Sequence, residues 1–185
     1  MKLDSSHRDK RSKLDLELFV LALVQHEINT PYRLRETVGL SPGATIPVLK
    51  RLQEAGYVRP GKPGARGRTE FNITASGKQS LASGWRPLLE APAPSNLEAV
   101  LRITSLAMLS GAETKTVAAY LKRAAVVKTT DSKRSKRETR VIEPSRSSVR
   151  NVDLYPWMQQ AHKTARLAAE AKLVRQLAIA MLLHM

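Results

Sequence analysis

The sequence predicts a mainly α-helical fold that includes one short hairpin of β-strands. Apolar residues recur at helical spacing through most of the 185 residues, of which 42% are hydrophobic types. Glycine and proline interrupt this pattern over 60–68, between two short runs that read as strands. Pro92 and Pro94 then separate this first region from a second one with helical periodicity alone. We therefore expect an N-terminal domain over 15–91 and a helical C-terminal part.

The first two helices are bounded by residues that favour helix ends. The basic segment over 1–14 is expected to be a flexible arm. An apolar helix within DLELFVLALVQHE follows, from about residue 16 to residue 27. Thr30 and Pro31 then open a second, short helix that Gly39 closes.

A third helix follows, with a cap at Ser41, a proline at its first position (Pro42) and a stop at Gly56. Its expected core-facing residues recur at helical spacing: Val48, Leu49, Leu52 and Ala55. Its other side is polar and basic: Lys50, Arg51 and Gln53. Such a helix can lie in a DNA major groove. The same pattern also suits an ordinary amphipathic helix with a solvated face.

A β-hairpin completes the N-terminal domain. Tyr57 and Val58 lead into the run PGKPGARGR, and a second strand follows over 69–73. This loop can approach phosphates closely because little side-chain bulk intervenes. Three helices and then a hairpin with a basic, glycine-rich tip is the order of a winged helix-turn-helix.

Three segments make up the remainder of the chain. Residues 92–127 contain two helical patterns and are expected to form a helical hairpin that needs further partners to cover its apolar sides. Residues 128–150 lack an apolar period and are expected to be a basic, flexible linker, which can also order on DNA as a phosphate-contacting segment. Residues 151–185 form the longest helical pattern and carry a broad apolar stripe.

This stripe has two interpretations. It can pack against 96–127 within one chain, or it can form a dimer interface, including one in which helices are exchanged. We favour dimerisation because readers of symmetric DNA sites need two heads about 34 Å apart. The residues assigned to the interface are Leu154, Trp157, Met158, Ala161, Ala165, Ala168, Val174, Ala178 and Met181.

The charge favours a polyanionic partner. Thirty-one Lys and Arg against 16 Asp and Glu give a net charge of +15. The excess is concentrated in 1–80 and in 128–150. The absence of cysteine excludes disulfides and fits a cytoplasmic protein. No apolar run approaches the roughly 18 residues of a membrane span, and the basic N-terminus is not followed by a signal-peptide cleavage site.

The runs SPGATIPVLKRLQEAGYV and GRTEFNITASGKQSL resemble the winged-helix domain of PadR-type bacterial transcriptional regulators. The resemblance covers roughly 15–85, and the matching residues are Ser41, Pro42, Gly43, Pro47, Leu49, Lys50, Arg51, Leu52, Glu54, Gly56, Gly67, Arg68, Phe71, Thr74 and Gly77. The chain departs from the family at Thr45 and Ile46, where the family has leucine and an aromatic residue. It also departs at 30–32, where the family often has His-Gly-Tyr. Sequence preference is therefore not carried over.

The resemblance implies double-stranded DNA as partner, a homodimer formed by C-terminal helices, and repression relieved by a small molecule. We expect DNA contacts from Arg33, Ser41, Thr45, Ile46, Lys50, Arg51, Lys62, Arg66 and Arg68. Thr45, Ile46 and Lys50 are expected nearest to base edges, and the arginines and Lys62 nearest to the backbone. An effector pocket, if present, is expected near Trp85, Trp157 and Met158, which also suit core positions.

The sequence gives no support for an enzyme. The four histidines, His7, His26, His162 and His184, lack metal-ligand spacing, and the glycine run lacks the spacing of a phosphate-binding loop. We therefore expect no catalytic residue, metal or cofactor. Two alternatives to a sequence-specific regulator remain: a non-specific architectural nucleic-acid-binding protein, and a winged-helix module that binds a protein partner. Low aromatic content argues against a surface that stacks single-stranded bases.

Overall fold

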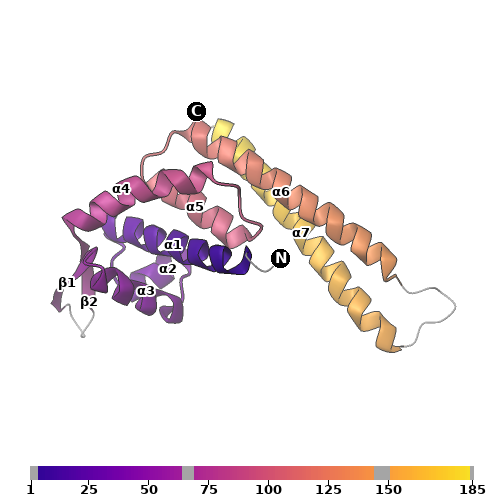
Figure 1. The fold of residues 1–185 in the computed structure, drawn as a ribbon, viewed down its shortest axis with the longest axis horizontal. Coiled ribbons are helices and arrows are strands. Elements are labelled where there is room, and N and C mark those ends of the chain that lie inside the picture. Colours follow the sequence, from indigo (N-terminus) through magenta and orange to yellow (C-terminus); the bar gives the residue numbers. More distant parts are fainter. Residues whose placement is uncertain (1–3, 64–68, 144–150, 184–185) are drawn as a thin grey trace. The chain divides into compact units, whose positions relative to one another are not determined.

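The computed structural model describes residues 4–63, 69–143 and 151–183 (Figure 1). Within them the chain is mainly helical, with a two-stranded antiparallel sheet after the third helix, as the sequence predicts. The elements are α1 (Asp4–Gln25), α2 (Pro31–Val38), α3 (Pro42–Glu54), β1 (Val58–Pro63), β2 (Thr69–Ile73), α4 (Ala75–Glu90), α5 (Leu97–Leu109), α6 (Thr114–Val141) and α7 (Asn151–Leu183). No helix in the described part of the chain combines the length and apolar composition that a membrane span requires.

The chain divides into two compact units, which we describe separately. The first unit comprises Met1–Ala91 and Leu101–Glu113, and the second comprises Pro92–Val100 and Thr114–Met185. The proline break at Pro92 therefore coincides with a division between units, whereas most of α5 belongs to the first unit.

Helix α1 forms the centre of the core of the first unit. Residues 18–24 are all buried, and a helix that is apolar on every side needs neighbours all round it. Helices α3 and α4 and strand β2 supply these contacts. The helix begins at Asp4, so residues 4–14 are helical where the sequence favoured a flexible arm. Extension of an existing helix costs little, because each added residue contributes one main-chain hydrogen bond without a new nucleation step.

Helices α2 and α3 begin and end at the residues that the sequence predicts. The side-chain oxygens of Thr30 and Ser41 accept hydrogen bonds from main-chain N–H groups three residues later, at 3.1 and 3.3 Å. Gly39 and Gly56 adopt the left-handed conformation, with φ of 71° and 72°, just after the two helices. These local hydrogen bonds fix the turn between α2 and α3.

The β1–β2 hairpin is attached to the helices through main-chain groups. Val58 pairs with Ile73 in the antiparallel ladder, and Val58 is buried. The N–H of Phe71 donates to the carbonyl of Asn29 at 2.9 Å, so the connection between α1 and α2 is bonded to β2.

The start of α4 lies against the residues that connect α3 to β1. The Thr74 hydroxyl donates to the Gly56 carbonyl at 2.7 Å and accepts from the Gly77 N–H at 3.1 Å. A Cβ atom at Gly77 would overlap the Tyr57 carbonyl oxygen and lie 2.9 Å from Cγ1 of Ile73. Thr74 and Gly77, two of the residues that carry the PadR resemblance, therefore have a structural explanation in this contact.

The second unit is built on an antiparallel pair of long helices, α6 and α7, which lie side by side along their length (Figure 1). We call this pair the α6–α7 hairpin. Its seam contains small buried residues, including Ala124, Ala171 and Ala178, which let the helices approach closely. The helical hairpin expected over 92–127 is therefore corrected, since α6 pairs with α7.

Residues 128–141 continue α6, which corrects the expected flexible linker for this part of 128–150, whereas 144–150 lie outside the described residues. The side chains that this segment buries are polar. Lys128 is 1% exposed and Ser135 is 2% exposed. The Nζ atom of Lys128 donates to the Ser95 carbonyl and lies 2.5 Å from Oε2 of Glu170. A search for apolar periodicity cannot detect a helix of this kind.

Candidate nucleic-acid interface

Helix α3 has one buried face and one exposed face. Its buried residues are Thr45, Val48, Leu49 and Leu52, spaced at i, i+3, i+4 and i+7. Between them, Ile46 is 56% exposed, although isoleucine is a residue type that usually lies in a core. The Lys50 side chain is 77% exposed. The core contacts of α3 thus hold an apolar and a cationic side chain toward solvent on the opposite face.

The expectation that Thr45 contacts base edges is wrong. Thr45 is 1% exposed, and its hydroxyl donates to the Ser41 carbonyl at 3.2 Å within the first turn of α3. It shares its face with Val48 and Leu49, so it belongs to the core of the first unit. Ile46 and Lys50 remain as the expected base-facing residues.

Lys50 and Arg51 lie in different electrostatic environments. Lys50 Nζ is 3.8 Å from Oε1 of Glu54, an exposed pair of the kind that contributes at most about 1 kcal/mol. Arg51 Nε donates to Oε1 of Glu17 in α1 at 2.6 Å, and the Arg51 side chain is 44% exposed. Lys50 can therefore change partners easily, whereas Arg51 is fixed to the core helix through one edge of its guanidinium.

Arg33 and Ser41 both have structural partners. Arg33 Nη1 donates to the Glu27 carbonyl at 2.7 Å, and Glu27 has a positive φ of 64°, which is unusual for a residue with a side chain. Arg33 thus stabilises the turn after α1. Ser41 is exposed and caps α3. Among the remaining expected contacts, Lys62 belongs to β1, while Arg66 and Arg68 lie outside the described residues.

The structure adds three exposed polar residues on the same elements that the sequence analysis did not assign to DNA contact. Arg35 follows the buried Leu34 in α2, and Arg59 follows the buried Val58 in β1. Gln53 is exposed near the end of α3. The exposure of both arginines could have been predicted from the sequence, because each directly follows an apolar residue that faces the core.

The residues assigned to dimerisation fall into different environments. Val174 and Ala178 are buried in the seam of the α6–α7 hairpin. Leu154, Trp157, Ala161 and Met181 are half-buried, and Met158, Ala165 and Ala168 are exposed. Val174 and Ala178 therefore contribute to packing within one chain. Only the exposed residues of the set are free to contact a second copy in this arrangement.

The three residues considered for an effector pocket do not gather within one unit. Trp85 is 7% exposed in α4 of the first unit, whereas Trp157 and Met158 belong to α7 of the second. A hollow of about 280 Å³ lies beside Trp85, and the exposed Lys78 and Arg86 contribute to its lining. The Arg86 guanidinium lies 4.8 Å from the centre of the Trp85 ring.

The histidine and carboxylate groups of the described part of the chain lie in separate places. Within the described residues, no group of three or more His, Cys, Asp or Glu side chains is arranged to hold a metal ion. The His26 ring nitrogen Nε2 hydrogen-bonds the carbonyl of Leu109 at 2.9 Å, at the end of α5. His26 thus satisfies a helix-terminal carbonyl.

Comparisons with known proteins do not extend these observations. No protein-family model matches the chain, and a search of curated proteins finds no significant match.

Proposed function

We propose that this chain is a sequence-specific, double-stranded DNA-binding transcriptional regulator of the winged-helix type, acting as a homodimeric repressor. The observation that carries the proposal is the division of α3 into a buried face and an exposed face that presents Ile46 and Lys50. This helix follows α2 through a tightly capped turn and precedes the β1–β2 hairpin. That order, the net charge of +15 and the PadR-type resemblance support the same function.

In the proposed complex, α3 enters the major groove. Ile46 can contact a thymine methyl group, and Lys50 can donate to the acceptors on a guanine edge. Arg51 keeps its bond to Glu17 and directs its remaining N–H groups to a phosphate, since a guanidinium has five donors. Arg59 contacts the backbone from β1, together with Lys62.

The homodimer is proposed to form through the exposed side of α7. Tyr155, Met158 and Ile179 are 65%, 58% and 57% exposed, although they are large apolar or aromatic residues. A second copy would remove this surface from water. Relief of repression by a small molecule rests on the PadR-type resemblance alone, and we assign no residues to it.

The direct test is equilibrium binding to duplex DNA across a series of salt concentrations. The DNA upstream of the protein's own gene is compared with a scrambled duplex of the same length. We expect a preference of about a thousandfold or more at physiological salt, with two chains per site. Ile46→Ala and Lys50→Ala should change which sequence is preferred, whereas Lys78→Ala, an exposed control on α4, should not.

The alternatives predict different results. A steep salt dependence without sequence preference would identify an architectural protein and would sink the proposal. No duplex binding at physiological salt would favour a protein-docking module instead.

A further inference from the structure

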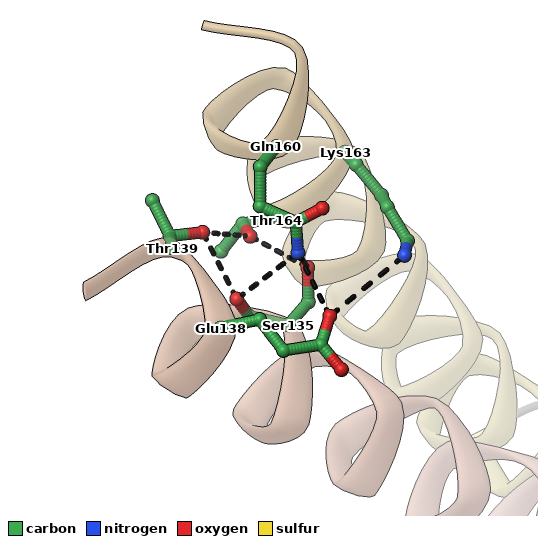
Figure 2. Close-up of polar contacts among 6 residues, drawn as sticks. All are labelled: Ser135, Glu138, Thr139, Gln160, Lys163 and Thr164. Carbon is green, nitrogen blue, oxygen red and sulfur yellow. Dashed lines mark hydrogen bonds and ion pairs between the residues drawn. The ribbon is translucent and has the colours of Figure 1, made fainter. Parts of the chain in front are cut away.

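The half of the α6–α7 hairpin nearest its connection is held together by polar side chains (Figure 2). The Ser135 and Thr139 hydroxyls lie 2.6 and 2.8 Å from the Thr164 hydroxyl across the seam. Gln160 Nε2 donates to Oγ of Ser135 at 3.1 Å and to Oε2 of Glu138 at 2.9 Å. These bonds keep α6 helical and apposed to α7 over a segment with few apolar residues.

The outer side of the same segment is densely basic. Five of its residues carry exposed cations: Lys133, Arg134, Lys136, Arg137 and Arg140. Lys133, Arg137 and Arg140 follow the spacing i, i+4 and i+7 and thus form one row along the helix. The exposed Lys122 and Lys115 extend this row toward the start of α6. Lys122 lies 11 residues before Lys133, and Lys115 lies 7 residues before Lys122, and both spacings are close to whole helical turns. We call this row, with its neighbours Arg134 and Lys136, the α6 basic row.

The acidic groups of α6 do not neutralise this row. Glu138 is turned toward α7, where it accepts from Gln160 and lies 3.9 Å from Lys163 Nζ (Figure 2). Asp131 is half-buried and lies two residues from Lys133, so it points to a different side of the helix. The polar seam thus separates the charges of α6, with carboxylates near α7 and cations outside.

A groove beside the row adds a cation from the second helix. It has a volume of about 400 Å³, and its charged lining residues are Lys122, Lys133 and Arg175. Arg175 comes from α7, where its Nε donates to the Ala171 carbonyl at 3.2 Å. The groove thus places a cation from α7 beside the row, next to the apolar side chains of Val126 and Ile179.

We propose that the α6 basic row is a second DNA-binding surface, which contacts the phosphate backbone of double-stranded DNA. The inference rests on the proposed function, because it concerns the same duplex partner. The row runs from Lys115 to Arg140 along a single helix, which at 1.5 Å per residue is about 37 Å. One helical turn of duplex DNA is about 34 Å, so the row can contact phosphates over about one turn.

Duplex DNA fits this surface better than the other polyanions. A membrane surface favours a helix with a continuous apolar side available for insertion, whereas Val126 is the one large apolar side chain that is exposed between Lys115 and Arg140. Single-stranded nucleic acids require aromatic side chains for stacking, and the described part of the row contains none. A straight row of cations without either feature matches a regular array of phosphates.

The test uses the full-length chain and two triple variants with equal loss of charge. The first is Lys133→Gln/Arg137→Gln/Arg140→Gln. The matched control, Lys78→Gln/Arg86→Gln/Lys172→Gln, removes three exposed cations from α4 and α7. Binding to a preferred and a scrambled duplex of about 30 base pairs is measured across a salt series, after thermal unfolding has verified that both variants fold.

We expect the first variant to lower the slope of log affinity against log salt by about 2 to 3, since each lost phosphate contact removes about 0.9. The affinity should fall by the same factor for both duplexes, so that the sequence preference is unchanged. The control should lower the slope by less than about 1. Equal slopes for the two variants would overturn the inference while leaving the proposed function intact. A wild-type chain without sequence preference would instead reject the proposed function. The inference would also be overturned if the first variant bound duplex DNA as the wild type does but lost binding to anionic vesicles or single-stranded RNA.

Discussion

The Nζ atom of Lys128 lies 2.5 Å from Oε2 of Glu170, although only 1% of the Lys128 side chain is exposed to solvent. The same ammonium group donates to the Ser95 carbonyl. An ammonium group removed from water needs partners for its charge and its donors, and here a carboxylate and a carbonyl supply them. The pair therefore fixes one register of α6 against α7.

Lys128→Met is expected to destabilise the protein by about 2–4 kcal/mol, because it removes the buried partner of Glu170 and leaves only the exposed Arg166, whose Nε lies 3.6 Å from Oε1 of Glu170. Urea unfolding followed by circular dichroism measures this change. The double variant Lys128→Met/Glu170→Met should recover most of the loss, since apolar residues of similar volume often replace a buried ion pair without cost. A cost below about 1 kcal/mol for the single variant would contradict this account.

Gly77→Ala is expected to cost about 1–3 kcal/mol, because the new Cβ overlaps the Tyr57 carbonyl and forces α4 away from the connection between α3 and β1. Gly43→Ala is the matched control within α3. Its Cβ would have Ser41 Oγ as nearest neighbour, at 3.9 Å, and alanine favours the helix, so stability should be unchanged or higher. Thermal unfolding of both variants distinguishes close packing from a general effect of glycine replacement.

Thr45→Val and Ile46→Ala are expected to have opposite profiles in DNA binding. Thr45→Val keeps the shape of a buried residue, and the Ser41 carbonyl still accepts from the main-chain N–H of residue 45. DNA preference should therefore be unchanged and stability altered by no more than about 1 kcal/mol. Ile46→Ala changes an exposed side chain, so stability should shift by less than about 0.5 kcal/mol while the preferred sequence changes.

Competitive binding to a pool of randomised duplexes measures both preferences. If Thr45→Val changed the preferred sequence and Ile46→Ala did not, the assignment of the two faces of α3 would be wrong.

The polar seam of the α6–α7 hairpin is expected to respond non-additively to substitution. Thr164→Val leaves the Ser135 and Thr139 hydroxyls without their shared partner and should cost about 1–2 kcal/mol. The triple variant Ser135→Ala/Thr139→Val/Thr164→Val removes the whole hydroxyl cluster and should restore stability to the original value or above it. Chemical unfolding measures both, and DNA affinity should stay the same because the α6 basic row is unaltered. Additive losses across the three positions would rule out a mutually satisfied cluster.

Local signals in the sequence predicted the ends of α2 and α3 accurately, whereas Ala55, expected to face the core, is exposed. Thr30, Ser41 and Gly56 act on main-chain groups within a few residues of themselves, so their effect does not depend on the rest of the fold. The burial of Thr45 can also be predicted from the sequence, because this residue precedes Val48 and Leu49 at helical spacing. Threonine is a polar residue type that can also contact DNA, so residue type and helical spacing indicate different faces for this side chain.

The extent of α6 could not be predicted in this way. Apolar periodicity measures burial of hydrocarbon, whereas Lys128 and Ser135 are buried through bonds to Glu170 and Thr164. Those partners lie 42 and 29 residues further along the chain. A pairing of this kind depends on how α7 returns along α6, which no local pattern records.

The bond between the Phe71 N–H and the Asn29 carbonyl joins strand β2 to the connection between α1 and α2. Both partners are main-chain atoms, and every residue except proline can supply the donor. Mutational drift in the side chains of the hairpin therefore leaves this tether in place. A lineage carrying this fold can therefore vary the side chains of its β1–β2 hairpin while the strand remains anchored beside the helices.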